Sequence, residues 1–121
     1  MLSGPLEIGD NTWIGHEVLV TGGAAAVRIG SDVDIAPRVT LVTGTHVLFE
    51  GPGKAAGRGY SEPIVIGNGA WIGAASTILG GVRVGAESVV ASGALVCADV
   101  AQRTVVGGIP ARVLREEGQP C

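Results

Sequence analysis

A six-residue repeat is the feature that most limits how this chain can fold. Aliphatic residues recur at every sixth position in two blocks, which an interruption separates. A period of six fits neither a helix nor a plain alternating strand, and it predicts a short strand followed by a sharp turn, repeated along the chain. The aliphatic positions are Ile8, Ile14, Val20, Ile29, Ile35, Leu41, Ile66, Ile72, Ile78, Val84, Val90 and Val96.

The other positions of the repeat are also restricted. The fourth residue after each aliphatic position is small or β-branched, and glycine often follows the aliphatic residue directly. The chain is 46% hydrophobic but only 3% aromatic, with 21 glycines, which favours a core of small aliphatic side chains and many tight turns. Three repeats predict one triangular coil, and successive coils then pair as parallel strands about 4.8 Å apart. We therefore expect one all-β domain over residues 1–121, a parallel β-helix of about four coils.

Two breaks in the repeat locate its irregular parts. The step from Val20 to Ile29 is nine residues, which predicts a three-residue bulge within 24–28. The step from Leu41 to Ile66 is 25 residues, which predicts a protruding loop over about 47–65. Long loops in compact domains are commonly functional. The repeat ends after residue 100, and we expect 105–114 to cap the last coil.

Charge and hydropathy exclude several classes of partner. The net charge is −3 and the eight Lys and Arg residues are scattered, so no basic stripe predicts binding to nucleic acid. The amino-terminal residues lack a basic segment followed by an apolar one, and no 18 apolar residues run together, so we expect a cytoplasmic protein with no membrane partner. Cys97 and Cys121 have no metal or redox spacing, and we expect free thiols.

Four segments carry a resemblance to a known family: Thr43–His46, Tyr60–Pro63, Trp71–Gly73 and Val106–Val113. The repeat, the loop placement and residues 60–115 resemble the hexapeptide-repeat O-acetyltransferases, such as the galactoside, maltose and colanic acid acetyltransferases. The resemblance implies a left-handed prism, a homotrimer with active sites between subunits, and transfer of an acetyl group from acetyl-CoA to a sugar or saccharide hydroxyl. The spacing alone gives no handedness, and the general rule for parallel crossovers is right-handed.

The resemblance implies that His46 is the catalytic base. A neutral imidazole can accept the proton of a hydroxyl, which then attacks the thioester directly, and the ordinary pKa of histidine suits that role. A lone histidine beside a loop is otherwise a solvated side chain. Trp13, His16 and Glu17 match a stretch that lines the acceptor groove, although an outward-facing His16 without a role is the preferred alternative. Tyr60, with Lys54 and Arg58, is a candidate to touch the acceptor or a neighbouring subunit.

The resemblance also implies where acetyl-CoA binds. Two arginines near the carboxyl end match positions close to the CoA phosphates, and guanidinium groups suit phosphate geometry; a solvated cap is the alternative. Trp71 is equally a candidate to pack the trimer. The implied cofactor-binding residues are Trp71, Gly73, Ala74, Ser92, Gly93, Arg112 and Arg115.

Three positions depart from the family pattern. Ala74 stands where the galactoside enzyme has a serine, so backbone N–H groups would have to stabilise the oxyanion. Ala98 stands where the family has a lysine, and Gly15 lies nearest to the place of a sugar-binding asparagine. The identity of the acceptor is therefore open.

Other functions remain as alternatives. In one alternative the acceptor is an antibiotic or an amino sugar. In another the chain is a non-catalytic trimeric scaffold or an inactive paralogue. Serine acetyltransferases are disfavoured, because the helical amino-terminal domain of that group has no counterpart. A zinc carbonic anhydrase of the same prism needs three histidines, and this chain has two, so we expect no metal.

Overall fold

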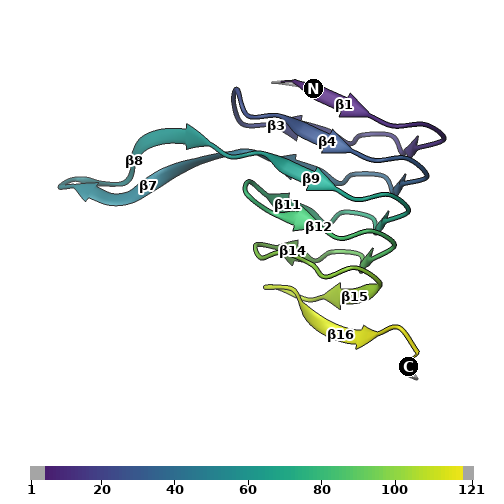
Figure 1. Cartoon of the computed structure of the whole chain (residues 1–121). Helices are drawn as coiled ribbons and strands as arrows, with labels where there is room; N and C mark the ends of the chain where they lie inside the picture. Colours follow the sequence, from purple (N-terminus) through teal and green to yellow (C-terminus); the bar gives the residue numbers. More distant parts are fainter. Residues whose placement is uncertain (1–4, 119–121) are drawn as a thin grey trace.

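The chain folds into a stack of triangular coils. The computed structural model describes residues 5–118. All regular secondary structure in this part of the chain is β-strand. Each coil contributes three short strands, and the coil winds left-handed, as the resemblance implies (Figure 1). The strands of the four coils are β1 (Leu6–Ile8), β2 (Trp13–Ile14), β3 (Leu19–Thr21); β4 (Val27–Ile29), β5 (Asp34–Ile35), β6 (Thr40–Val42); β9 (Ile64–Ile66), β10 (Trp71–Ile72), β11 (Thr77–Leu79); and β12 (Arg83–Val84), β13 (Val89–Val90), β14 (Leu95–Val96).

Three parallel sheets form the faces of this prism. The first sheet has the order β1-β4-β9-β12, the second contains β2-β5-β10-β13, and the third has the order β3-β6-β11-β14. Equivalent aliphatic residues are neighbours across the coils, as Ile35, Ile72 and Val90 are in the second sheet. All three are fully buried. The stacked aliphatic residues are the core that the repeat predicts.

The corners explain why the repeat needs small residues. Gly73 donates its N–H to the carbonyl of Val90 in the next coil (2.7 Å), and a Cβ at Gly73 would lie 2.6 Å from the backbone nitrogen of Ser92. Adjacent coils therefore approach too closely for a side chain at this position. Ser76 is fully buried where the walls converge, and its hydroxyl donates to the carbonyl of Gly73 (2.8 Å). A small residue fits there without leaving a buried polar group unpaired.

The predicted loop is a β-hairpin, which we call the arm. It consists of β7 (Gly44–Gly51) and β8 (Lys54–Ser61), which pair antiparallel and extend away from the prism (Figure 1). The arm thus begins three residues, and ends four residues, before the expected loop bounds of about 47–65. Pairing satisfies backbone groups that a bare loop would leave to water, and Ile64, which was placed in the loop, is fully buried in β9.

The carboxyl-terminal segment also differs from its prediction. Residues 105–114 were expected to cap the fourth coil, but β15 (Thr104–Gly107) continues the second sheet, where Val106 pairs with Val90. β16 (Arg112–Glu116) then returns antiparallel along β15 and forms the last strand of that sheet. At the other end Ile8 is 46% exposed, because its coil has a neighbour on one side only among the described residues.

Two remaining predictions concern the cysteines and membranes. Cys97 is an exposed free thiol, and Cys121 lies outside the described residues. No helix within residues 5–118 is long and apolar enough to cross a membrane.

Candidate functional site

A hollow lies where the arm leaves the prism. It has a volume of ≈ 580 Å³ and is bounded by the first residues of β7, the last residues of β8 and the corner that follows β3. The hydroxyl of Ser61 accepts the N–H of Ala25 (3.1 Å), which ties the arm to that corner. His46 and Tyr60 both line the hollow. The structure therefore brings together the predicted base and one predicted acceptor contact.

The orientation of His46 is fixed by the arm itself. Its Nδ1 lies 2.8 Å from the carbonyl oxygen of Gly57. A carbonyl oxygen can only accept a hydrogen bond, so Nδ1 carries the proton and Nε2 of the neutral ring keeps its lone pair. The side chain is exposed. An imidazole held in this form can accept a proton from a hydroxyl group.

A second group of predicted residues lies elsewhere on the prism. The corner between the second and third sheets carries His16, Glu17, Ala74, Ser92 and Gly93, and the adjoining second sheet presents Trp13 and Trp71; we call these seven residues the corner group. Consecutive coils are joined there by the N–H of Gly93, which donates to the carbonyl of Ala74 (2.9 Å). Glu17 pairs with Arg38 at 2.8 Å.

Two exposed tryptophans stand out in the corner group. Trp13 and Trp71 are 55% and 57% exposed, and Asp34 pairs with both of them on the strand between. Sequence reasoning did not single out Asp34. A signal was present, because the residue before each buried aliphatic residue of this sheet faces outward: Trp13 precedes Ile14, and Asp34 and Trp71 stand in equivalent places.

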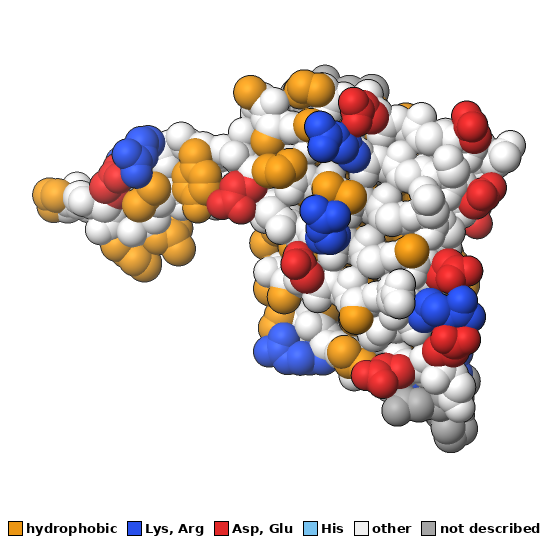
Figure 2. All heavy atoms as spheres, viewed as in Figure 1, with side chains coloured by type: hydrophobic (Ala, Val, Ile, Leu, Met, Phe, Trp, Pro, Cys, Tyr) orange, Lys and Arg blue, Asp and Glu red, His pale blue; other side chains and the backbone are white. Residues whose placement is uncertain are grey.

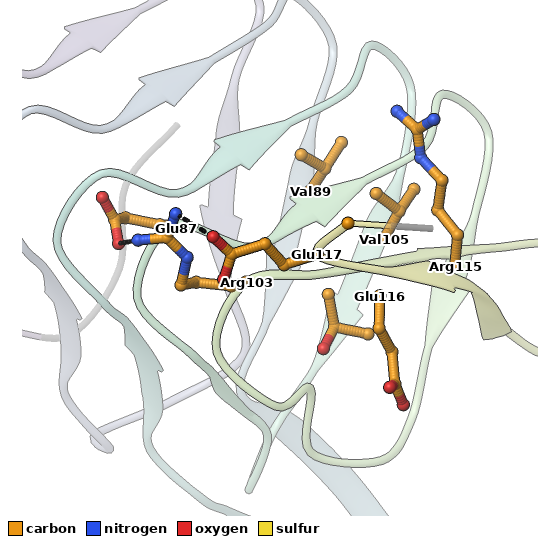
Figure 3. Close-up of a pocket in the computed structure, with 9 residues that line it drawn as sticks. Glu87, Val89, Arg103, Val105, Arg115, Glu116 and Glu117 are labelled. Atoms are coloured by element: carbon orange, nitrogen blue, oxygen red, sulfur yellow. Dashed lines mark hydrogen bonds and ion pairs between the residues drawn. The ribbon is translucent and has the colours of Figure 1, made fainter. Parts of the chain in front are cut away.

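The predicted phosphate contacts lie on the last strand. Arg112 is exposed, and its Nη1 donates to the carbonyl of Ala111 (3.2 Å). Arg115 is half-buried and lines a hollow of ≈ 300 Å³ with Val89 and Val105. Its guanidinium extends away from the acidic side chains on the other side of this hollow (Figure 3).

An ion-pair cluster holds this strand to the fourth coil. Arg103 lies between Glu87 (2.8 Å) and Glu117 (2.6 Å), as Figure 3 shows. The hydrogen bond and charge of Glu117, and then the charge of Glu87, raise the pKa of Arg103 above its ordinary value. All three side chains are about half exposed, so the cluster orients β16 more than it stabilises the fold.

One chain does not unite all of the predicted site residues. His46 and Tyr60 lie at the corner between the third and first sheets, whereas the corner group lies at the other edge of the third sheet. The width of that sheet separates the two sets. Within residues 5–118, no three His, Cys, Asp or Glu side chains are grouped so that they could hold a metal ion.

Comparison with known proteins agrees with this architecture. Residues 63–98 match the family model described as bacterial transferase hexapeptide (six repeats). The chain is 46% identical over 91 residues to galactoside O-acetyltransferase of Escherichia coli, which is 74% of this chain and 44% of that protein. It is 40% identical over 109 residues to serine acetyltransferase 2 of Arabidopsis thaliana, which is 88% of this chain and 32% of that protein.

A solved structure shows the same fold. The hexapeptide-repeat acetyltransferase of Vibrio cholerae, crystallised with acetyl coenzyme A, is 38% identical and superposes with a TM-score of 0.85 over 94% of this chain and 61% of that one. The chain spans between about a third and a half of the length of the two curated relatives named above. The repeat, the fold and these relationships show that the chain belongs to the hexapeptide-repeat acyltransferase family.

Proposed function

We propose that this chain forms the catalytic unit of an acetyl-CoA-dependent O-acetyltransferase that acts on a sugar or saccharide hydroxyl. The observation that carries the proposal is the geometry of His46, whose Nδ1 is tied to the Gly57 carbonyl at the edge of an open hollow. The names of the galactoside O-acetyltransferase and of the acetyl-CoA complex support the choice of donor and acceptor class.

The proposed mechanism needs one general base. The acceptor hydroxyl gives its proton to Nε2 of His46 while its oxygen attacks the thioester carbonyl. The tetrahedral intermediate then collapses, the C–S bond breaks, and the leaving thiolate takes the proton from the imidazolium. The bond from Nδ1 to Gly57 persists through both steps and keeps the ring in place. Because Ala74 has no hydroxyl, backbone N–H groups of the prism would stabilise the oxyanion.

The proposal includes a homotrimer with active sites between subunits. The arm of one copy, placed against the corner group of another, would unite the two sets of residues that one chain keeps apart. Exposed apolar side chains also support an interface. Trp13 and Trp71 are more than half exposed on a parallel sheet, and such sheets are ordinarily covered on both faces. Light scattering measures the assembly, and a fully active monomer would contradict a shared site.

The proposal is tested by CoA release from acetyl-CoA with a panel of acceptors. The panel contains simple galactosides, other saccharides, an amino sugar and serine, the last because a serine acetyltransferase is among the relatives. His46→Ala should lower kcat about 10² to 10⁴-fold with trimerisation and acetyl-CoA affinity unchanged, whereas His16→Ala should have little effect. Near wild-type turnover by His46→Ala would show that another group activates the hydroxyl. Acetyl-CoA binding without turnover of any acceptor would favour a scaffold.

A further inference from the structure

The arm is irregular at two successive positions, with one bulge on each strand. The regular pairs His46↔Gly59, Leu48↔Ala56 and Gly51↔Lys54 are interrupted by two register shifts. The first leaves one extra residue on β8, at 57–58, and the second leaves one extra residue on β7, at 49–50. Phe49, in the second, has a φ of 56°, a conformation that bulky residues rarely adopt. Bulges of this kind re-aim side chains and are common next to active sites.

The bulge on β8 frees one peptide group from the strand pairing, and two side chains bind it. The carbonyl of this group, that of Gly57, lies 2.8 Å from Nδ1 of His46. Its N–H, that of Arg58, donates to Oε1 of Glu50 (3.1 Å). Glu50 itself lies in the bulge on β7. The Gly57–Arg58 peptide group thus lies between an imidazole and a carboxylate.

We propose that Glu50 is a positioning residue for His46 and acts through the Gly57–Arg58 peptide group. A carboxylate that accepts the N–H polarises the peptide group and strengthens its carbonyl as an acceptor for Nδ1–H. Glu50 thereby favours the ring form in which Nε2 is free to take a proton. A carboxylate bound directly to a histidine does the same in many sites, and here a peptide bond stands between the two.

Close packing around Gly57 fits this role. A Cβ at Gly57 would lie 2.7 Å from Cβ of Glu50 and 2.7 Å from the carbonyl oxygen of Val47. The peptide group is therefore held against β7 with no room for a side chain. The second contact of Glu50 is weaker, since Nη2 of Arg58 lies 3.6 Å from Oε2 of Glu50 and the Arg58 side chain is 73% exposed.

The inference rests on the proposed role of His46 as general base. Its first test therefore measures the proton position on the ring and does not depend on catalytic activity. The chain has two histidines, and ¹⁵N labelling of both reports which ring nitrogen carries the proton at alkaline pH. We expect His46 to be mainly protonated on Nδ1 in the wild type. In Glu50→Ala this population should fall toward that of an unrestrained imidazole, and in Glu50→Gln it should fall less. His16 serves as the internal reference, since its signal should not move.

Two matched variants separate this role from loss of an ion pair. Arg58→Gln removes the ion pair but keeps the backbone N–H, and Glu7→Gln breaks the pair between Glu7 and Arg28 (2.9 Å) on the distant strand β1. Neither should change the His46 signal. With the acceptor found in the panel, Glu50→Ala should lower kcat about tenfold with little change in KM, and should have no further effect in a His46→Ala background.

The two proposals fail in different ways. An unchanged proton position on His46 in Glu50→Ala would overturn the positioning role of Glu50 and leave the proposed function standing. A changed proton position with full activity would support the role of Glu50 and overturn the role of His46 as base. A shift of the His46 proton position that is equal in Glu50→Ala and Arg58→Gln would assign the effect to the ion pair and so overturn the inference.

Discussion

Gly57→Ala tests the geometry of the arm with a single methyl group. The added Cβ would lie 2.7 Å from Glu50 Cβ and from the Val47 carbonyl oxygen, about 0.7 Å short of ordinary van der Waals contact. Because the second of these neighbours is backbone, β8 has to move away from β7. A movement of that size is enough to lengthen the 2.8 Å contact between His46 and Gly57 to roughly the limit of a hydrogen bond. We expect kcat to fall about tenfold with little change in KM.

Gly59→Ala is the matched control, because it adds the same methyl group two residues along the same strand. Its Cβ would lie 3.6 Å from Cε1 of His46, which is ordinary contact. Steady-state kinetics of CoA release should therefore show a loss in Gly57→Ala and little change in Gly59→Ala, with the same melting temperature for both. Equal activity in the two variants would refute the argument that the Gly57 carbonyl orients the base.

Two further substitutions address the core and the cofactor. Ile72→Ala removes a fully buried side chain stacked between Ile35 and Val90, and it should lower the free energy of unfolding, measured in urea, by about 2–5 kcal/mol. The control Arg83→Ala, at an exposed side chain, should change this free energy little. A small effect of Ile72→Ala would contradict the stacked core. Arg115→Ala should raise KM for acetyl-CoA several-fold without lowering kcat. It should leave KM for acetyl-pantetheine unchanged, because only acetyl-CoA carries the nucleotide phosphates. An equal rise in KM for both donors would show that Arg115 does not contact these phosphates.

The repeat predicted the prism because its physics is local. Each aliphatic position, such as Ile35 or Ile72, contacts its equivalents in the adjacent coils, so a fixed spacing in sequence becomes a fixed place in the core. Handedness came only from the resemblance. Ile64 was misplaced because it lies two residues before Ile66, at a position that the six-residue spacing does not mark.

The site was harder to predict than the core. His46 and Tyr60 were predicted from family motifs, and both line one hollow in the structure. Glu50 and Gly57 escaped notice, because their contact depends on two bulges whose positions no periodicity reveals. The corner group was identified residue by residue, but its distance from His46 follows from the path of the chain around the prism, which motif matching does not supply.

The base of the arm has a consequence for how such proteins diversify. The arm starts and ends at one corner, where the N–H of Glu62 donates to the carbonyl of Thr43 (2.9 Å), and β6 and β9 flank it in consecutive coils. Figure 2 shows the arm projecting clear of the rest of the molecule. Lengthening the arm adds little to the entropic cost of bringing its two ends together. Insertions and deletions at its tip can therefore accumulate without disturbing the stacked coils, and under the proposed function they would alter the surroundings of the acceptor while the coils that we propose to hold the donor stay unchanged.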